Sequence, residues 1–298
     1  MLWDKYAERR FFEECLDERK VSPDKLFYRT KEGRYVAYWE KDYEGEEGET
    51  KETLQSRNSY IGDYTERWVI EKLQTIAQGF GLHLVHKVVC PPIGLSTRSP
   101  GDVGFCRTGQ KQQKPEDIAM ILEVKMSVVW NWEYDPVSKM VYCIGDFTTH
   151  AGRPSLLRSD TMLKAIGKSV NIRISSPAAA SIPIVIVGNT PITRDYYDKV
   201  DYLKDVGIIQ GFLSLNPSPL DSKTSELDIK ETPRGGFLRI DNQEELESVI
   251  NGFLTDKKVF FSSMKAEKEL GEIIEVANLE RDYEMKARKF LQLLKGGD

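Results

Sequence analysis

Residues 118–130, IAMILEVKMSVVW, predict a β-strand, because the stretch is apolar and rich in branched side chains. On a strand, Glu123 and Lys125 point to one face, while Val124 points to the other face and into packing. Charged residues in so apolar a strand cost free energy unless another group compensates them. We expect a metal ion held by Glu123, with Lys125 close by, to supply that compensation.

The Glu-x-Lys triplet alone is weak evidence for a site. The same triplet occurs at Glu18–Lys20, Glu49–Lys51 and Glu284–Lys286. None of these three lies in an apolar strand behind a suitable aspartate. The context of Glu123 and Lys125 therefore carries the prediction.

Two aspartates are candidates to share a metal with Glu123. Asp117 lies six residues earlier on the same predicted strand, about 20 Å away. Because each carboxylate must approach within about 2 Å of one Mg²⁺, Asp117 is excluded. Asp102 fits if 102–107 and 117–127 form an antiparallel hairpin, because it then pairs close to Glu123 and Val124. A one-residue shift or a bulge would bring its carboxylate beside that of Glu123.

Helices and strands alternate around this hairpin. The sequence predicts helices near 2–17, 60–79, 195–204, 242–254 and 264–295, another beginning at Ser159 or Asp160, and strands at 34–39, 81–89, 182–188 and 211–215. This alternation predicts an α/β core with a mixed sheet flanked by helices. We divide the chain into an N-terminal helical and acidic-loop extension (1–57), a core (58–215) and a mostly helical C-terminal region (216–298).

Asp102 in SPGDVGF, followed by Glu123-Val124-Lys125 on the next strand, resembles the signature of PD-(D/E)xK nucleases. The inserted Gly101 departs from that family's Pro-Asp pair. The resemblance covers residues 58–190 and implies a restriction-endonuclease-like core with helix, hairpin, helix and strand in that order. With this length and no GxxxxGK[ST] motif, the chain looks most like a type II restriction endonuclease that needs no nucleotide cofactor.

The resemblance also implies the chemistry of the site. Asp102 and Glu123 would hold Mg²⁺, with the carbonyl of Val124 as a further ligand. Lys125 would orient or help deprotonate the attacking water and stabilise the transition state. A third carboxylate often lies on the helix before the hairpin, which makes Glu66 a candidate.

Glu66 has an alternative interpretation. It belongs to the helical row 66, 69, 70, 73 and 77, and so points with the apolar face. It could equally extend past the edge of that face, or pair with Arg67 or Lys125. Glu71 lies toward the polar side and is the weaker candidate.

Basic residues follow the predicted catalytic strand. They are Arg153, Arg158, Lys164, Lys168 and Arg173, with Asp160 the acidic residue among them. Lys164 and Lys168 share one helix face, which either contacts DNA phosphates or is simply solvated. The polar hairpin turn is a candidate for entering a groove of the duplex, with Arg107, Gln110, Lys111, Gln112, Gln113 and Lys114.

Composition leaves the question of nucleic acid open. The formal net charge of the 298 residues is −5, but residues 43–52 carry five glutamates against one lysine. Without that segment the remainder is near neutral. The scattered cysteines argue against a structural zinc site or a disulfide framework. On a strand, His83 and His86 point to opposite faces and are expected to be ordinary strand residues.

The sequence thus predicts a cytoplasmic, Mg²⁺-dependent, sequence-specific endonuclease acting on double-stranded DNA. No apolar run approaches the roughly 18 residues of a membrane helix, and the N-terminus becomes charged too early for a secretory signal. A homodimer is expected, because both strands of the duplex must be cut. The alternatives are a structure-specific or repair nuclease of the same fold, and a DNA-binding module without cleavage.

Overall fold

The computed structural model describes residues 2–41, 43, 50–216, 229–255 and 267–294. Its centre is a six-stranded sheet in the order β10-β9-β8-β5-β4-β3. These strands are β3 (His83–Val88), β4 (Gly101–Cys106), β5 (Ile118–Val124), β8 (Ile184–Gly188), β9 (Gly211–Ser214) and β10 (Phe237–Arg239). β3, β4 and β5 are antiparallel, whereas β5, β8, β9 and β10 run parallel. The mixed sheet predicted from the sequence is confirmed.

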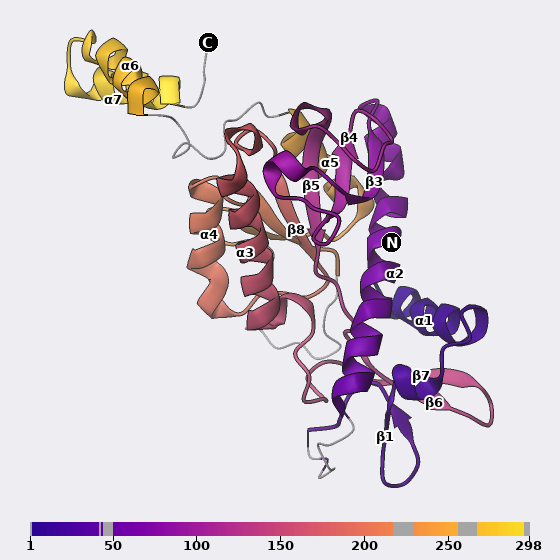
Figure 1. The fold of residues 1–298 in the computed structure, drawn as a ribbon. Coiled ribbons are helices and arrows are strands. Elements are labelled where there is room, and N and C mark those ends of the chain that lie inside the picture. Colours follow the sequence, from indigo (N-terminus) through magenta and orange to yellow (C-terminus); the bar gives the residue numbers. More distant parts are fainter. Residues whose placement is uncertain (1, 42, 44–49, 217–228, 256–266, 295–298) are drawn as a thin grey trace.

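Helices cover both faces of this sheet (Figure 1). On one face lie α2 (Thr50–Gly79) and α5 (Gln243–Thr255), and on the other lie α3 (Ser159–Ser175) and α4 (Tyr197–Asp205). Successive residues of β5 enter different cores: Leu122 and Val124 pack on the α2 side, and Ile121 packs on the α3 side. Glu123 follows Ile121 by two residues and therefore faces α3.

Strand β5 ends at Val124, six residues before the predicted end of the strand. The Lys125 N–H still bonds to the Val187 carbonyl of β8, but the N–H groups of Ser127, Val129 and Trp130 bond to side chains. Ser127 N donates to Asn189 Oδ1 at 3.1 Å, and the N–H groups of Val129 and Trp130 donate to the Glu8 carboxylate. The apolar residues 126–130 are buried in spite of this, which is why their pattern resembles a longer strand.

A second, antiparallel sheet has the order β1-β2-β6-β7. Its strands are β1 (Tyr28–Arg29), β2 (Tyr35–Val36), β6 (Asn131–Asp135) and β7 (Met140–Gly145). The β6–β7 hairpin was not predicted, although Asp135-Pro136 is a turn signal, because its strands are short and partly exposed. The boundary that the sequence suggested after residue 57 falls inside α2, and this sheet contains strands from both sides of that boundary.

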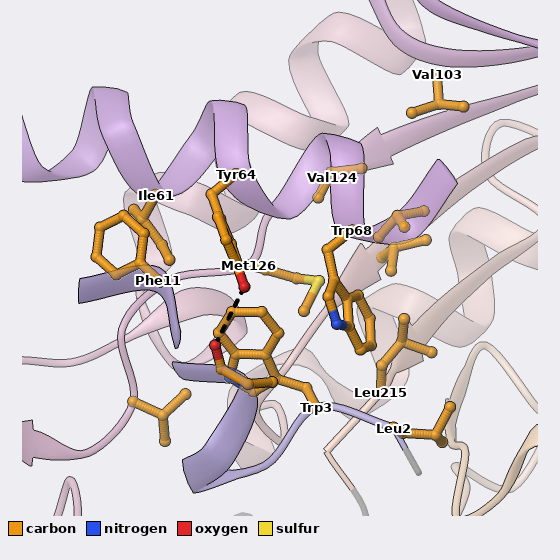
Figure 2. Packing of buried hydrophobic residues seen from close by; sticks show 14 of the residues in the cluster. Leu2, Trp3, Phe11, Ile61, Tyr64, Trp68, Val103, Val124, Met126 and Leu215 are labelled. Carbon is orange, nitrogen blue, oxygen red and sulfur yellow. Dashed lines mark hydrogen bonds between the residues drawn. The ribbon is translucent and has the colours of Figure 1, made fainter. Parts of the chain in front are cut away.

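The N-terminal segment packs into the main core. α1 (Lys5–Glu13) continues into a π-helical turn over Glu14–Glu18. Trp3 lies with its ring edge-on to Trp68 of α2, with ring centroids 5.3 Å apart, and Tyr64 OH donates to the Ala7 carbonyl at 3.5 Å (Figure 2). α1 therefore belongs to the same hydrophobic cluster as α2 and the sheet.

The C-terminal region contains two helices where one long helix was expected. α6 (Glu267–Asn278) and α7 (Tyr283–Leu294) are separated at residues 279–282. The break has a local cause, because Asp282 Oδ1 accepts from Met285 N at 2.8 Å and caps α7. Among the apolar residues of α6, Ile273 and Ala277 are buried, while Ile274 is 48% exposed. Among the described helices, none has an apolar span that would cross a bilayer.

Candidate active site

The β4–β5 hairpin brings Asp102 and Glu123 together. Val103 pairs with Leu122 across the two strands, so the adjacent Asp102 lies opposite Glu123. The irregularity in this ladder lies at Phe105 and Cys106, toward the other end. The pairing of Asp102 near Glu123 is therefore as predicted, and it requires neither a shift nor a bulge at Asp102.

Lys125 contacts both carboxylates from the first position after β5. Its Nζ lies 3.0 Å from Asp102 Oδ2, 3.2 Å from Glu123 Oε2 and 3.2 Å from the Val124 carbonyl oxygen. Its backbone is fixed on both sides: the N–H donates to the Val187 carbonyl at 2.6 Å, and its carbonyl accepts from Ser155 Oγ at 2.7 Å. The trio expected from the sequence is thus assembled.

A second lysine, which the sequence did not place here, also enters the site. Lys168 of α3 has its Nζ 2.7 Å from Glu123 Oε1 and 3.4 Å from Asp102 Oδ1, and donates to the Pro100 carbonyl at 2.5 Å. Its side chain is 21% exposed, against 76% for Lys164 one turn earlier. The prediction that Lys164 and Lys168 share one DNA-contacting or solvated face is wrong for Lys168, because α3 packs over the sheet and Lys168 points inward.

Burial and neighbouring charges shift the pKa values of the two carboxyl groups in opposite directions. Glu123 is fully buried, and this burial, together with the charge of Asp102, raises its pKa to about 7 against the opposing effect of both lysines. Burial also acts against the charged form of Asp102, but Lys125 and Lys168 outweigh it and hold the pKa of Asp102 below its ordinary value. The two carboxylates likewise outweigh burial at Lys125 and raise the pKa of its ammonium.

The oxygen atoms of this cluster fit a hard divalent cation. Asp102 and Glu123 present carboxylate oxygens to the same space, and the Val124 carbonyl lies beside them. Glu123 Oε1 is buried and accepts no hydrogen bond of normal geometry from the described residues, although the Lys168 ammonium is close. Such an acceptor favours a cation partner. Within the described parts of the chain, no group of three or more His, Cys, Asp or Glu side chains is arranged to hold a metal.

Glu66 pairs with a residue of β3, a partner that its helical spacing does not predict. Its Oε2 lies 2.5 Å from His86 Nε2 on β3, and 3.9 Å from Lys87 Nζ. Burial and the charge of Asp102 raise the pKa of Glu66, while His86 opposes the shift. Glu66 is thus electrostatically linked to the site but is held by His86, not by Arg67 or Lys125.

The backbone of β3 is unusual beside Asp102. Lys87, which faces Asp102 across the β3–β4 ladder, has φ of 54°, in the left-handed region. This conformation is uncommon for a residue with a side chain. It lets the Lys87 ammonium reach Asp63 and Glu66 on α2, the same helix that His86 contacts. The alternation expected for residues 81–89 is therefore broken at Lys87.

The predicted DNA-contacting residues fall into exposed and buried groups. Arg153, Arg158, Lys111 and Lys114 are exposed, as is Lys164. Arg173 is fully buried and donates to carbonyls, including that of Ile182 at 2.8 Å, so it is removed from the basic face. Gln113 is 5% exposed and donates to the Thr108 carbonyl at 2.9 Å, which holds the turn and excludes it as a base reader.

Comparisons with models of protein families, with curated proteins and with solved structures gave no match to this chain.

Proposed function

We propose that this chain is a Mg²⁺-dependent endonuclease that hydrolyses phosphodiester bonds in double-stranded DNA at a specific sequence, as type II restriction endonucleases do. The observation that carries the proposal is the meeting of Asp102, Glu123 and Lys125 at adjoining ends of β4 and β5. Charged groups gathered and buried in this way are typical of functional sites. The chain order α2, β3, β4–β5, β6–β7, α3 and β8 supports the proposal, because it contains helix, hairpin, helix and strand in the order that the family resemblance implies, with β3 and the β6–β7 hairpin as additions.

Each group in the trio has a defined task in this proposal. Asp102 and Glu123 would hold the cation, with the Val124 carbonyl as a further ligand. When bound, Mg²⁺ supplies neutralisation of phosphate charge and a lower pKa for an attacking water. Val124 contributes in a second way, since its N–H donates to Asp102 Oδ2 at 2.8 Å and fixes that carboxylate.

Lys125 would act on the reacting groups themselves. Its ammonium is tethered to a backbone that is hydrogen-bonded on both sides, so its position is preorganised. A positioned ammonium beside the scissile phosphate stabilises the charge that develops on the phosphate oxygens and orients the water. The carboxylates keep Lys125 protonated, so its first role is that of a charge and a hydrogen-bond donor.

Digestion of several unrelated plasmids with MgCl₂, followed by sequencing of the fragment ends, tests the proposal. A specific endonuclease gives sharp, reproducible fragments whose ends share one sequence. Glu123→Gln should abolish cleavage, while the matched control Asp117→Asn, at the other end of the same hairpin, should cut like the parent chain. Cleavage confined to branched or damaged DNA would indicate the structure-specific alternative. Binding to DNA with no cleavage under any divalent cation would indicate the non-catalytic module.

A further inference from the structure

Lys125 and Lys168 each contact one oxygen atom of Asp102 and one oxygen atom of Glu123. Lys125 takes Oδ2 of Asp102 and Oε2 of Glu123, at 3.0 and 3.2 Å. Lys168 takes the other pair, Oδ1 and Oε1, at 3.4 and 2.7 Å. The four formal charges cancel, so the buried carboxylates are neutralised without any metal.

The oxygen pair beside Lys125 has more hydrogen-bond partners than the pair beside Lys168. Oδ2 of Asp102 also accepts from the Val124 N–H, and Lys125 donates to the Val124 carbonyl as well. At the other pair, the contacts come from Lys168, whose Nζ lies 2.7 Å from Glu123 Oε1 and 3.4 Å from Asp102 Oδ1, and no backbone N–H of the described residues donates to these two oxygens. The Oδ1 and Oε1 pair is therefore the pair that offers more to an incoming cation.

We propose that Lys168 is a displaceable counter-ion, which occupies the oxygen pair that a divalent cation would take and competes with it. This inference rests on the proposed function, because it presumes that the site binds Mg²⁺. Two positive groups cannot share this buried oxygen pair without strong repulsion, so cation binding requires the Lys168 ammonium to withdraw. Its flexible four-carbon stem permits the movement, and the Pro100 carbonyl at 2.5 Å provides a neighbouring acceptor.

The withdrawn ammonium would remain beside the carboxylates and contact the substrate. A cation tethered there on α3 matches a non-bridging oxygen of the DNA phosphate. Lys168 would thus change partners, from carboxylates in the metal-free chain to phosphate in the loaded complex. Lys125 would keep its contacts with Asp102 Oδ2 and Glu123 Oε2, and the Val124 carbonyl, which has two lone pairs, could serve both Lys125 and the cation.

Titration of the full chain with MgCl₂ in the absence of DNA, followed by calorimetry, tests the competition. Lys168→Met removes the charge and retains an unbranched side chain, and we expect it to bind Mg²⁺ about tenfold more tightly than the parent, because a competing positive charge is lost. Lys164→Met is the matched control, since it makes the same change one turn away at an exposed position. The control should bind Mg²⁺ like the parent.

Equal or weaker Mg²⁺ binding by Lys168→Met would overturn the inference. If the parent chain itself binds no divalent cation, the proposed function fails instead, so the two failures are distinguishable. Folding is checked by circular dichroism, and Lys168→Gln, which keeps a donor for the Pro100 carbonyl, serves if the methionine variant does not fold. If both variants are unfolded, refolding on addition of Mg²⁺ supports a displaceable counter-ion. Failure to refold with Mg²⁺ shows that Lys168 is a permanent structural charge.

Discussion

The backbone N–H of Val124 donates to Oδ2 of Asp102 at 2.8 Å, so the last residue of β5 orients the carboxylate of β4. The position of the Asp102 carboxylate therefore depends on how β4 and β5 are paired. Asp102→Asn should preserve it, because the amide oxygen of asparagine accepts in the same way. The charge is lost, however, so we expect Mg²⁺ binding and cleavage to fall while the fold persists.

Calorimetry and circular dichroism of Asp102→Asn separate these effects. Retained folding with Mg²⁺ affinity reduced by about tenfold or more is expected, since one of two charged ligands becomes neutral. Undiminished Mg²⁺ affinity would remove Asp102 from the cation site.

The pKa of Glu123 sets a pH dependence for cation binding. Because its folded-state pKa is raised to about 7, this carboxyl is increasingly protonated below pH 7, and a bound proton competes with the cation. We expect Mg²⁺ affinity to fall by about tenfold per pH unit below 7, and to level off above it. Calorimetric titrations from pH 5.5 to 8.5 measure the profile. An affinity that stays constant down to pH 5.5 would contradict the assignment of Glu123.

Glu8 anchors α1 to the segment that follows the active strand. It is fully buried and accepts from the N–H groups of Val129 and Trp130 and from the indoles of Trp3 and Trp132, at 2.8–3.1 Å. Glu8→Ala leaves these donors buried without an acceptor, and each such group costs about 1–3 kcal/mol. We therefore expect at least about 3 kcal/mol of lost unfolding free energy in urea titrations.

A neighbouring glutamate provides the control for Glu8. Glu13 lies on the same helix, and its half-exposed carboxylate pairs with Arg9 at 2.9 Å. Because exposed pairs contribute little, Glu13→Ala should change the unfolding free energy by less than about 1 kcal/mol. If both variants lose the same stability, the Glu8 network does not have the special role described here.

The exposed basic residues should contribute to DNA affinity without taking part in the chemistry. Lys164 is 76% exposed and only weakly paired with Asp160, at 3.4 Å. Lys164→Ala should weaken DNA binding uniformly across sequences and reduce the salt slope by about one unit, as expected for one lost phosphate contact. Fluorescence anisotropy over a range of NaCl concentrations measures both quantities. An unchanged slope would assign Lys164 to a solvated helix face.

The sequence predicted the site best where a local pattern determines the geometry. Strand periodicity placed Glu123 with Lys125, and hairpin spacing paired Asp102 with Glu123, because both depend on residues close in sequence. Lys168 was misplaced because helix periodicity gives its face but not what packs against that face. His86 was missed as the partner of Glu66, since that contact depends on how α2 lies over β3.

Longer-range features of the fold were outside what sequence patterns can predict. The β6–β7 hairpin finds its partner in β2, about a hundred residues earlier, through pairs such as Tyr35 with Tyr134. The segment after β5 is bound by Glu8, a side chain from the N-terminal helix, which accepts from the N–H groups of Val129 and Trp130. Both features arise from tertiary contacts, which override local propensity.

Single-turnover cleavage by Lys125→Ala, compared with the parent chain at saturating MgCl₂, shows whether Asp102, Glu123 and Lys125 form a nuclease site. Calorimetry must first show that this variant still binds Mg²⁺, and its melting temperature must show that it is folded, because Lys125 also neutralises buried carboxylates. We predict a rate at least about a hundredfold lower, the typical effect of losing a positioned electrostatic or proton-transfer group. A folded Lys125→Ala protein that cuts DNA as fast as the parent would contradict the nuclease site.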